Sequence, residues 1–268
     1  MTAESAETAA PMPKFHHREE VMGTIVTIDL FNDADLRRGD VELLVVEAVR
    51  LLHDADAVFS TWNHGSPVSR LRRGEIEVGE APAVVAEVLD LCERAREITG
   101  GWFDPWAIRG GVDPTGYVKG WAAQRALDAL VSPAIGGAIV NAAGDIATFG
   151  GPAEGIPFRV GIVDPASPRQ LAFVVETAGA IATSGAYERG EHLVNPRTGE
   201  HRSSVASATV SGPDLGLADA LATALAVGGA DVLARIEALD DFEALAIGFD
   251  GVATWTTGFR LAPPASVH

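Results

Sequence analysis

The sequence predicts an α+β fold: a single compact domain with a mostly antiparallel sheet and flanking helices. Helical and strand patterns do not alternate one for one, and several consecutive strand patterns occupy the middle of the chain. A doubly wound parallel sheet requires such alternation, so this order favours antiparallel strands. Because no internal repeat or long linker divides the chain, we expect one domain over 21–262, with a disordered tail over 1–20 and a short tail over 263–268.

The first half of the domain is predicted to contain one strand and two long helices. Apolar and polar residues alternate over 24–30, which is typical of a half-buried strand. Apolar residues at helical spacing then predict a helix over 41–59, with Asp40 as its N-cap. A second helix is predicted over 83–98, and it should stop at Gly100 because glycine readily adopts the left-handed C-cap conformation.

The second half of the domain is predicted to hold most of the strands. A helix over 117–130 follows the turn-forming DPTG, and the segment 136–151 predicts a strand, a glycine-centred bend and another strand. Two helices over 217–229 and 230–239 precede a closing hairpin around the Asp-Gly pair at 250–251. Further strands are predicted at 158–163, within 171–183 and at 204–212.

The charge balance limits the partners that the protein could bind. The chain carries 37 acidic and 20 basic residues, a formal net charge of -17, which disfavours nucleic acid and anionic membranes. A phosphorylated ligand would therefore need a local lysine or a metal ion. The N-terminus lacks the apolar segment of a signal peptide and a lipid-attachment cysteine, and no apolar run is long enough to span a membrane. Together with a single cysteine, Cys92, these features lead us to expect a cytoplasmic protein.

The most unusual segment is LADALATALAVGG (217–229), an apolar helical pattern that contains Asp219 and Thr223. Residues four apart project from one helix face, and a helix that is apolar on all sides is normally buried. One interpretation is that the two side-chain oxygens bind a hard cation such as Mg²⁺, which would compensate a costly buried carboxylate. The alternative is that Asp219 accepts hydrogen bonds from backbone amides in the first helical turn, with Thr223 bonded to the carbonyl of Asp219.

Two other segments allow both a ligand-binding and an ordinary structural interpretation. VDPTGYVKGW (112–121) places Asp113 before a turn and Lys119 in the first turn of a helix, an arrangement that suits an anionic ligand. The alternative is a common turn followed by a surface lysine. In NAAGDI (141–146), Gly144 would let the backbone approach a ligand closely, or would only bend the chain between two strands.

EHLVNPRTGEH (191–201) gathers His192, Asn195 and Arg197 in one loop. Histidine could transfer a proton near neutral pH, and arginine could bind a phosphate through two hydrogen bonds. A surface loop with incidental polar residues is the alternative. Trp62 could stack on a planar ring system, or it could be a core tryptophan.

Taken together, these segments resemble the ApbE family of FAD:protein FMN transferases. A single motif would be weak, but eight motifs in the same order make a specific match. In order along the chain, the motifs are MGT (22–24), FSTWNHGSPVSRL (59–71), GWFDP (101–105), DPTGYVKG (113–120), NAAGD (141–145), ATSG (182–185), HLVNPRTG (192–199) and ADALATAL (218–225).

The resemblance implies an enzyme that uses Mg²⁺, or Mn²⁺, together with FAD. It implies transfer of the FMN half of FAD to a threonine hydroxyl of an acceptor protein, with formation of a phosphoester and release of AMP. Asp219, Thr223 and the main-chain carbonyl of Gly116 resemble the family's metal ligands. The positions expected to contact FAD are Met22, Trp62, Trp102, Phe103, Asp104, Asp113, Lys119, Leu193 and Arg197.

The catalytic residues expected from the resemblance are His192, Asn195 and Lys119. His192 matches the histidine that helps to activate the attacking hydroxyl, and Lys119 would offset phosphate charge. Asn195 stands where the family usually has an aspartate. If that aspartate only shapes the turn, asparagine can replace it. If it acts as a base or orients the histidine, the reaction should be slower in this chain.

Two other functions stay open on the sequence alone. If water replaced threonine in the same site, the protein would hydrolyse FAD to FMN and AMP. If the change at Asn195 abolished the chemistry, the protein would bind FAD without turning it over. In the transferase interpretation, the expected partners are FAD and a threonine-bearing flavin-acceptor protein, with no nucleic acid and no membrane insertion.

Overall fold

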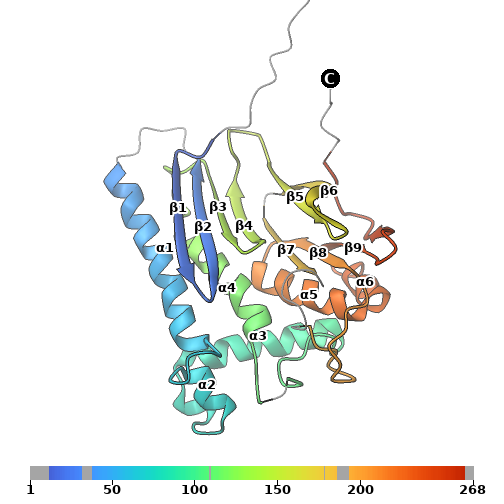
Figure 1. Ribbon diagram of the computed structural model, residues 1–268. Helices are drawn as coiled ribbons and strands as arrows, with labels where there is room; N and C mark the ends of the chain where they lie inside the picture. Colours follow the sequence, from blue (N-terminus) through green and yellow to red (C-terminus); the bar gives the residue numbers. More distant parts are fainter. Residues whose placement is uncertain (1–11, 32–37, 109, 178, 186–192, 263–268) are drawn as a thin grey trace, which may run out of the picture.

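The computed structural model describes residues 12–31, 38–108, 110–177, 179–185 and 193–262 (Figure 1). Its helices are α1 (Arg38–Phe59), α2 (Pro67–Arg72), α3 (Ala83–Thr99), α4 (Thr115–Asp128), α5 (Leu215–Gly228) and α6 (Ala230–Ile236), with a 3-10 helix at Val78–Glu80. Its strands are β1 (Phe15–Val21), β2 (Thr24–Phe31), β3 (Gly137–Ala142), β4 (Asp145–Gly150), β5 (Phe158–Asp164), β6 (Ser167–Thr177), β7 (Ala180–Gly185), β8 (Ser207–Gly212), β9 (Glu243–Ile247) and β10 (Ala253–Trp255).

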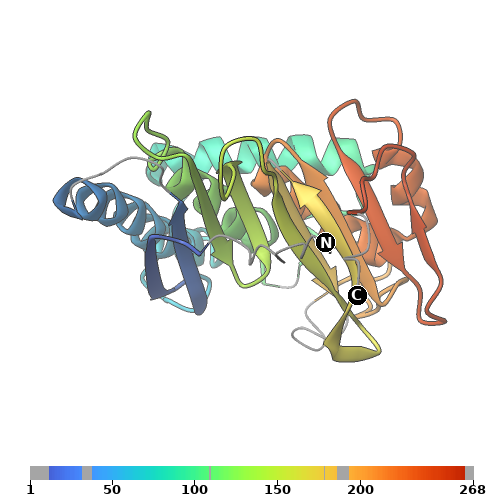
Figure 2. The same cartoon turned by 90° about the horizontal axis from the view of Figure 1, so that it is seen from above.

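These elements confirm the predicted α+β fold with antiparallel sheet. Within the described residues, the main sheet has the strand order β1-β2-β3-β4-β7-β8-β9-β10, and every neighbouring pair is antiparallel. Helices cover one face of this sheet, while the separate β5–β6 hairpin lies over the other face (Figures 1 and 2). The closing hairpin of β9 and β10 around residues 250–251 is also as predicted.

Alternate residues of the central strands enter two different cores. Ala182 and Val210 join the main core beneath the helices, whereas Ile181 and Leu245 join a smaller core under the β5–β6 hairpin. Side chains alternate along a strand, so the sheet is buried on both faces in this region. Polar side chains on the helix-facing side of the sheet therefore lie in a largely apolar interior.

One boundary prediction is wrong. The tail expected over 1–20 overlaps β1, which pairs with β2 from Phe15 opposite Leu30 to Val21 opposite Thr24. The turn between them has positive φ at its two central residues, 54° and 67°, as the right-handed twist of a two-residue hairpin requires. FHHREEV did not indicate a strand because polar residues lie on both of its faces, which is common in edge strands.

The helices match the predicted segments to within three residues at each end. α1 begins at Arg38, so Asp40 lies inside the first turn and the prediction that it is the N-cap is wrong. In that position its charge complements the helix dipole. α3 ends at Gly100, whose φ of 64° is left-handed as predicted. α2 is too short to show a helical period in sequence, and Ser66 caps it by accepting a hydrogen bond from the Ser69 amide at 3.0 Å.

The single cysteine provides a test of this packing. Cys92 lies in α3 and is fully buried, and burial, with a smaller effect of the Asp113 charge, raises the pKa of its thiol to about 12. Only the thiolate reacts readily with alkylating reagents, so the native protein should resist iodoacetamide at about pH 8. Intact mass should show full labelling after unfolding in urea. Rapid labelling of the native protein would contradict the described position of α3.

Candidate active site between two helices and the sheet

The candidate site lies where α4 and α5 cross beneath the sheet. Both helices carry glycine at the crossing: a Cβ atom on Gly120 would lie 2.4 Å from the Leu215 carbonyl oxygen, and one on Gly216 would lie 2.7 Å from the Tyr117 ring. Only glycine permits such a close approach of one backbone to another helix. The crossing brings α4, which carries two predicted site residues, against α5, which carries two more.

Asp219 lies one turn into α5, beyond the amides of the first turn. The helix begins at Leu215, and Asp214 is its N-cap, with Oδ1 accepting a hydrogen bond from the Leu217 amide at 2.6 Å. The alternative in which Asp219 satisfies its own helix start is therefore wrong, because Asp214 already fills that position. The hydroxyl of Thr223 lies 3.4 Å from the hydroxyl of Ser184 on β7.

The carboxyl group of Asp219 is buried and incompletely satisfied. The residue is 3% exposed, and its Oδ2 atom has no hydrogen-bond partner among the described residues. Burial and the nearby Asp145 carboxyl raise the pKa of Asp219 well above its usual value, while Lys119 and a backbone hydrogen bond with Gly120 lower it. An unpartnered buried carboxyl oxygen is costly, so this atom marks a position where a cation or a donor group is expected to bind.

Asp145, at the start of β4, is the site residue that sequence reasoning missed. Its side chain is almost fully buried and forms an ion pair with Lys119 of α4, and its Oδ1 atom accepts a hydrogen bond from the Thr183 amide at 3.2 Å. The preceding turn has positive φ at Ala143 (55°) and Gly144 (99°), which directs the chain into β4. The available signal was a carboxylate placed directly after a turn glycine between two apolar strands.

Two of the predicted metal ligands lie side by side. A Cβ atom on Gly116 would be 3.8 Å from Thr223 Oγ1 and 3.3 Å from the ring of Phe103, which is itself buried. Together with Asp219, this region offers carboxylate, hydroxyl and main-chain oxygens, the donor types that Mg²⁺ prefers. No group of three His, Cys, Asp or Glu side chains in the described ranges is arranged to hold a metal. A cation here would therefore depend on hydroxyl, main-chain and substrate oxygens, which suits Mg²⁺ better than zinc.

Two of the predicted FAD contacts between residues 102 and 113, Asp104 and Asp113, already form hydrogen bonds and ion pairs with other residues of the protein. Asp104 accepts hydrogen bonds from Arg96 Nε and the Trp106 amide, both at 2.9 Å. Asp113 pairs with Arg72 at 2.6 Å, and its other oxygen accepts hydrogen bonds from the amide and hydroxyl of Thr115 at the start of α4. These two carboxylates hold the loop before α4 in shape.

The remaining predicted contacts differ in their surroundings. Trp62 is 91% exposed, so the alternative of a core tryptophan is wrong. Met22 occupies the turn between β1 and β2, with a φ of 54°. Leu193 is buried and belongs to the main core. Trp102 packs against α5, where a Cβ atom on Gly228 would lie 2.7 Å from its ring.

The loop that follows Leu193 is held by its own side chains. Asn195 Oδ1 accepts a hydrogen bond from the Arg197 amide at 2.9 Å, and the Asn195 carbonyl accepts one from Gly199 at 2.7 Å. The Arg197 guanidinium lies 3.9 Å from the centre of the Trp102 ring, a cation–π geometry. Asn195 thus shapes a turn, as the first of its two interpretations requires. His192 lies outside the described residues.

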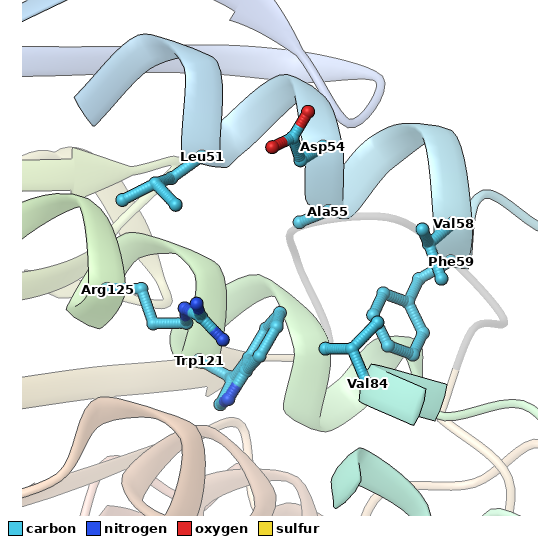
Figure 3. A pocket seen from close by; sticks show the side chains of 8 residues that line it. All are labelled: Leu51, Asp54, Ala55, Val58, Phe59, Val84, Trp121 and Arg125. Carbon is cyan, nitrogen blue, oxygen red and sulfur yellow. The ribbon is translucent and has the colours of Figure 1, made fainter. Parts of the chain in front are cut away.

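A hollow lies between α1 and α4, lined by none of the predicted site residues (Figure 3). It has a volume of about 210 Å³, and its lining is apolar apart from Asp54 and Arg125. Trp121 forms one wall, where its ring makes an edge contact with Phe59 at 5.7 Å and lies 4.8 Å from the Arg125 guanidinium. None of the residues expected to bind FAD or metal lines this cavity.

In the part of the chain that the structure describes, no helix has the length and apolarity needed to cross a membrane.

Comparisons with known proteins point to one family. The model of the ApbE family matches residues 22–109 and 107–246, which make up most of the chain. A curated FAD:protein FMN transferase from Vibrio cholerae is 34% identical over 129 residues, 44% of this chain and 39% of that protein. One of the same name from Rhodobacter capsulatus is 35% identical over 136 residues, 47% of this chain and 26% of that protein. The chain thus matches less than half of the length of either curated relative.

Solved structures share the fold. The flavin transferase ApbE from Vibrio cholerae gives a TM-score of 0.78 at 24% identity, covering 91% of this chain and 97% of that one. The flavinyl transferase ApbE from Pseudomonas stutzeri, in its apo form, gives 0.75 at 21% identity, covering 91% and 94%. At these identities the likeness establishes the architecture and not the activity. The extent of the family match, on a chain with this fold, shows that the protein belongs to the ApbE family.

Proposed function

We propose that the protein is a Mg²⁺-dependent FAD:protein FMN transferase, which attaches FMN from FAD to a threonine hydroxyl of an acceptor flavoprotein and releases AMP. The observation that carries this proposal is the buried Oδ2 atom of Asp219, which has no hydrogen-bond partner among the described residues and lies on the same helix face as Thr223. The hydroxyl of Thr223 in turn lies close to Gly116. Membership of the ApbE family and the names of the two curated relatives support the same reaction.

Each side chain around the site would make a different contribution to FAD binding. Lys119 would offset the negative charge of the diphosphate, which a protein of net charge -17 would otherwise repel. Trp62 presents an exposed ring on which a planar part of FAD can stack. Asp104 and Asp113 fix the loop before α4, which carries Phe103 to the start of the helix, where Gly116 lies between the Phe103 ring and Thr223.

Phosphoryl transfer asks mainly for positioning and charge neutralisation, and little covalent chemistry from the protein. Asp219, Thr223 and the Gly116 carbonyl would hold Mg²⁺, which when bound supplies positive charge to the diphosphate and to the departing AMP oxygen. His192, by its match to the family motif, would accept the proton of the attacking threonine or orient its hydroxyl.

Substitutions at Asn195 test whether this position only shapes the turn or takes part in the chemistry. Because its Oδ1 atom accepts the Arg197 amide, Asn195→Asp should keep the turn, and FMN transfer should stay within about threefold of the parent. Asn195→Ala removes the acceptor, and a lost turn hydrogen bond of about 1 kcal/mol or more should lower transfer by about tenfold. Steady-state rates with saturating FAD measure both. A large gain of activity in Asn195→Asp would instead show that the family's aspartate acts as a base or orients the histidine.

The reaction is tested by the mass of the acceptor. The protein, FAD and Mg²⁺ should be incubated with a threonine-bearing flavin-acceptor domain, and a variant of that domain with threonine replaced by valine serves as the control. The account predicts a mass gain of one FMN residue on the first domain only, with AMP released in equal amount. Rapid AMP release without any acceptor would identify an FAD pyrophosphatase. FAD that stays bound and intact with Mg²⁺ present would identify a non-catalytic binding protein.

A further inference from the structure

The ion pair between Asp145 and Lys119 differs from the other ion pairs described in the chain by its depth. Asp145 is 0% exposed and its side chain 1%, whereas the Lys119 side chain is 26% exposed. The other carboxylates in ion pairs have side chains that are 17% exposed or more within the described residues. A carboxylate with this degree of burial needs its partners to be fixed, because leaving it unpaired costs several kcal/mol.

Asp145 is anchored from two sides. Asp145 is the first residue of β4, and its backbone pairs with Ala142 of β3. Its Oδ1 atom accepts a hydrogen bond from the Thr183 amide of the neighbouring strand β7. The lysine partner has the opposite character, since it is a point charge on a flexible four-carbon chain. In this pair the rigid sheet therefore determines where the ammonium of Lys119 lies.

The surroundings of the Asp145–Lys119 pair indicate that it does more than stabilise the fold. The Asp219 carboxyl is close enough to both residues for Asp145 to raise its pKa and for Lys119 to lower it. Two buried carboxyl groups that share one lysine repel each other, and apolar side chains of similar volume would stabilise the fold at least as well. The arrangement fits a site in which Lys119 must be kept at one place near the Asp219 carboxyl, whose Oδ2 atom has no hydrogen-bond partner among the described residues.

We propose that Asp145 is a positioning residue that fixes the ammonium of Lys119 for the diphosphate of FAD. This inference rests on the proposed function, because it takes FAD as the ligand. Asp145 itself contacts neither FAD nor the acceptor in this scheme. It acts through Lys119, so its removal should matter only for ligands that carry the diphosphate.

The test is a double-mutant cycle on FAD binding. Asp145→Asn keeps the shape and the Oδ1 acceptor for the Thr183 amide but removes the charge that holds Lys119. Asp145→Asn and Lys119→Gln should each weaken FAD binding by about tenfold to a hundredfold, the worth of a charge-assisted contact. The double variant should bind FAD no more weakly than Lys119→Gln alone, since both changes remove the same interaction.

Riboflavin, which lacks phosphate, is the second probe, and equilibrium quenching of flavin fluorescence measures both ligands. Riboflavin affinity should not change in Asp145→Asn. Glu176→Gln, which removes the carboxylate partner of Arg159 on the β5–β6 hairpin, is the matched control and should leave both affinities unchanged. If Asp145→Asn does not fold, Asp145→Glu replaces it, and the longer carboxylate should shift FAD affinity while sparing riboflavin.

Three results would overturn the inference. These are parental FAD affinity in the Asp145 variant, additive losses in the double variant, and equal losses for riboflavin and FAD, which would indicate a purely structural residue. Each of them leaves the transferase proposal standing as long as the parent protein binds FAD. A parent protein that binds no FAD would contradict both proposals at once.

Discussion

Replacing Asp219 with asparagine is expected to lower the rate of FMN transfer by about a thousandfold, because a bound cation contributes several kcal/mol of charge stabilisation. Asparagine preserves the size of the side chain but removes the charge of a carboxyl group whose Oδ2 atom has no hydrogen-bond partner among the described residues. Transfer rates at saturating FAD over a range of Mg²⁺ concentrations measure the effect. Asp241→Asn, at an exposed acidic position, is the control and should leave the rate unchanged.

The same variant should not be less stable than the parent when metal and FAD are absent. The parent buries an incompletely satisfied carboxyl there, and an amide is less costly to bury. Mg²⁺ with FAD should raise the Tm of the parent, since a ligand that binds only the native state stabilises it. The Tm of Asp219→Asn should not respond to the cation. Transfer at the parental rate in this variant would remove the metal from the account.

Gly120→Ala is expected to destabilise the protein by about 3 kcal/mol, at the upper end of the usual cost of overpacking a core. The added Cβ atom would meet the Leu215 carbonyl oxygen at 2.4 Å, and neither backbone can move without separating α4 from α5. Alanine favours helix by about 1 kcal/mol over glycine, which offsets only part of this cost. Urea unfolding at constant pH measures the difference in the free energy of unfolding.

Gly39→Ala is the matched control, because it makes the same substitution in a helix where a Cβ atom would meet nothing within 4 Å. It should leave the protein as stable as the parent or stabilise it by about 0.5–1 kcal/mol. Gly120→Ala should also slow FMN transfer, because the spacing of the two helices sets Gly116 against Thr223. Parental stability in Gly120→Ala would show that the helices do not cross as closely as described.

The fold could largely be predicted from the sequence because its long elements have strong periods. Strands on both sides of the Gly144 turn and the helix that ends at Gly100 followed from apolar pattern and turn residues. β1 could not be found in this way, since an edge strand with polar residues on both faces has no clear alternation. The start of α5 was also predictable in principle, because Asp214 directly precedes the apolar run as an N-cap does.

The candidate site could be predicted only in part, because its contacts depend on which strands are neighbours. Asp219 and Thr223 share a helix face, so their proximity followed from spacing alone. Asp145 meets Lys119 and Asp219 only because β4 lies beside β7 on the sheet face that packs against α4 and α5, and no local pattern encodes that order. The contact between Arg197 and the Trp102 ring could not be predicted either, because the two residues are far apart in the sequence.

The central claim is that one divalent cation binds at the oxygens of Asp219, Thr223 and Gly116, and anomalous diffraction tests it most directly. Crystals of the parent protein grown with FAD and Mn²⁺, as a substitute for Mg²⁺, should show an anomalous peak at about 2.1 Å from each of these three oxygens. Crystals of Asp219→Asn grown in the same way should lack the peak. A strong peak elsewhere on the diphosphate, with the Asp219 carboxyl bonded only to main chain, would contradict the account.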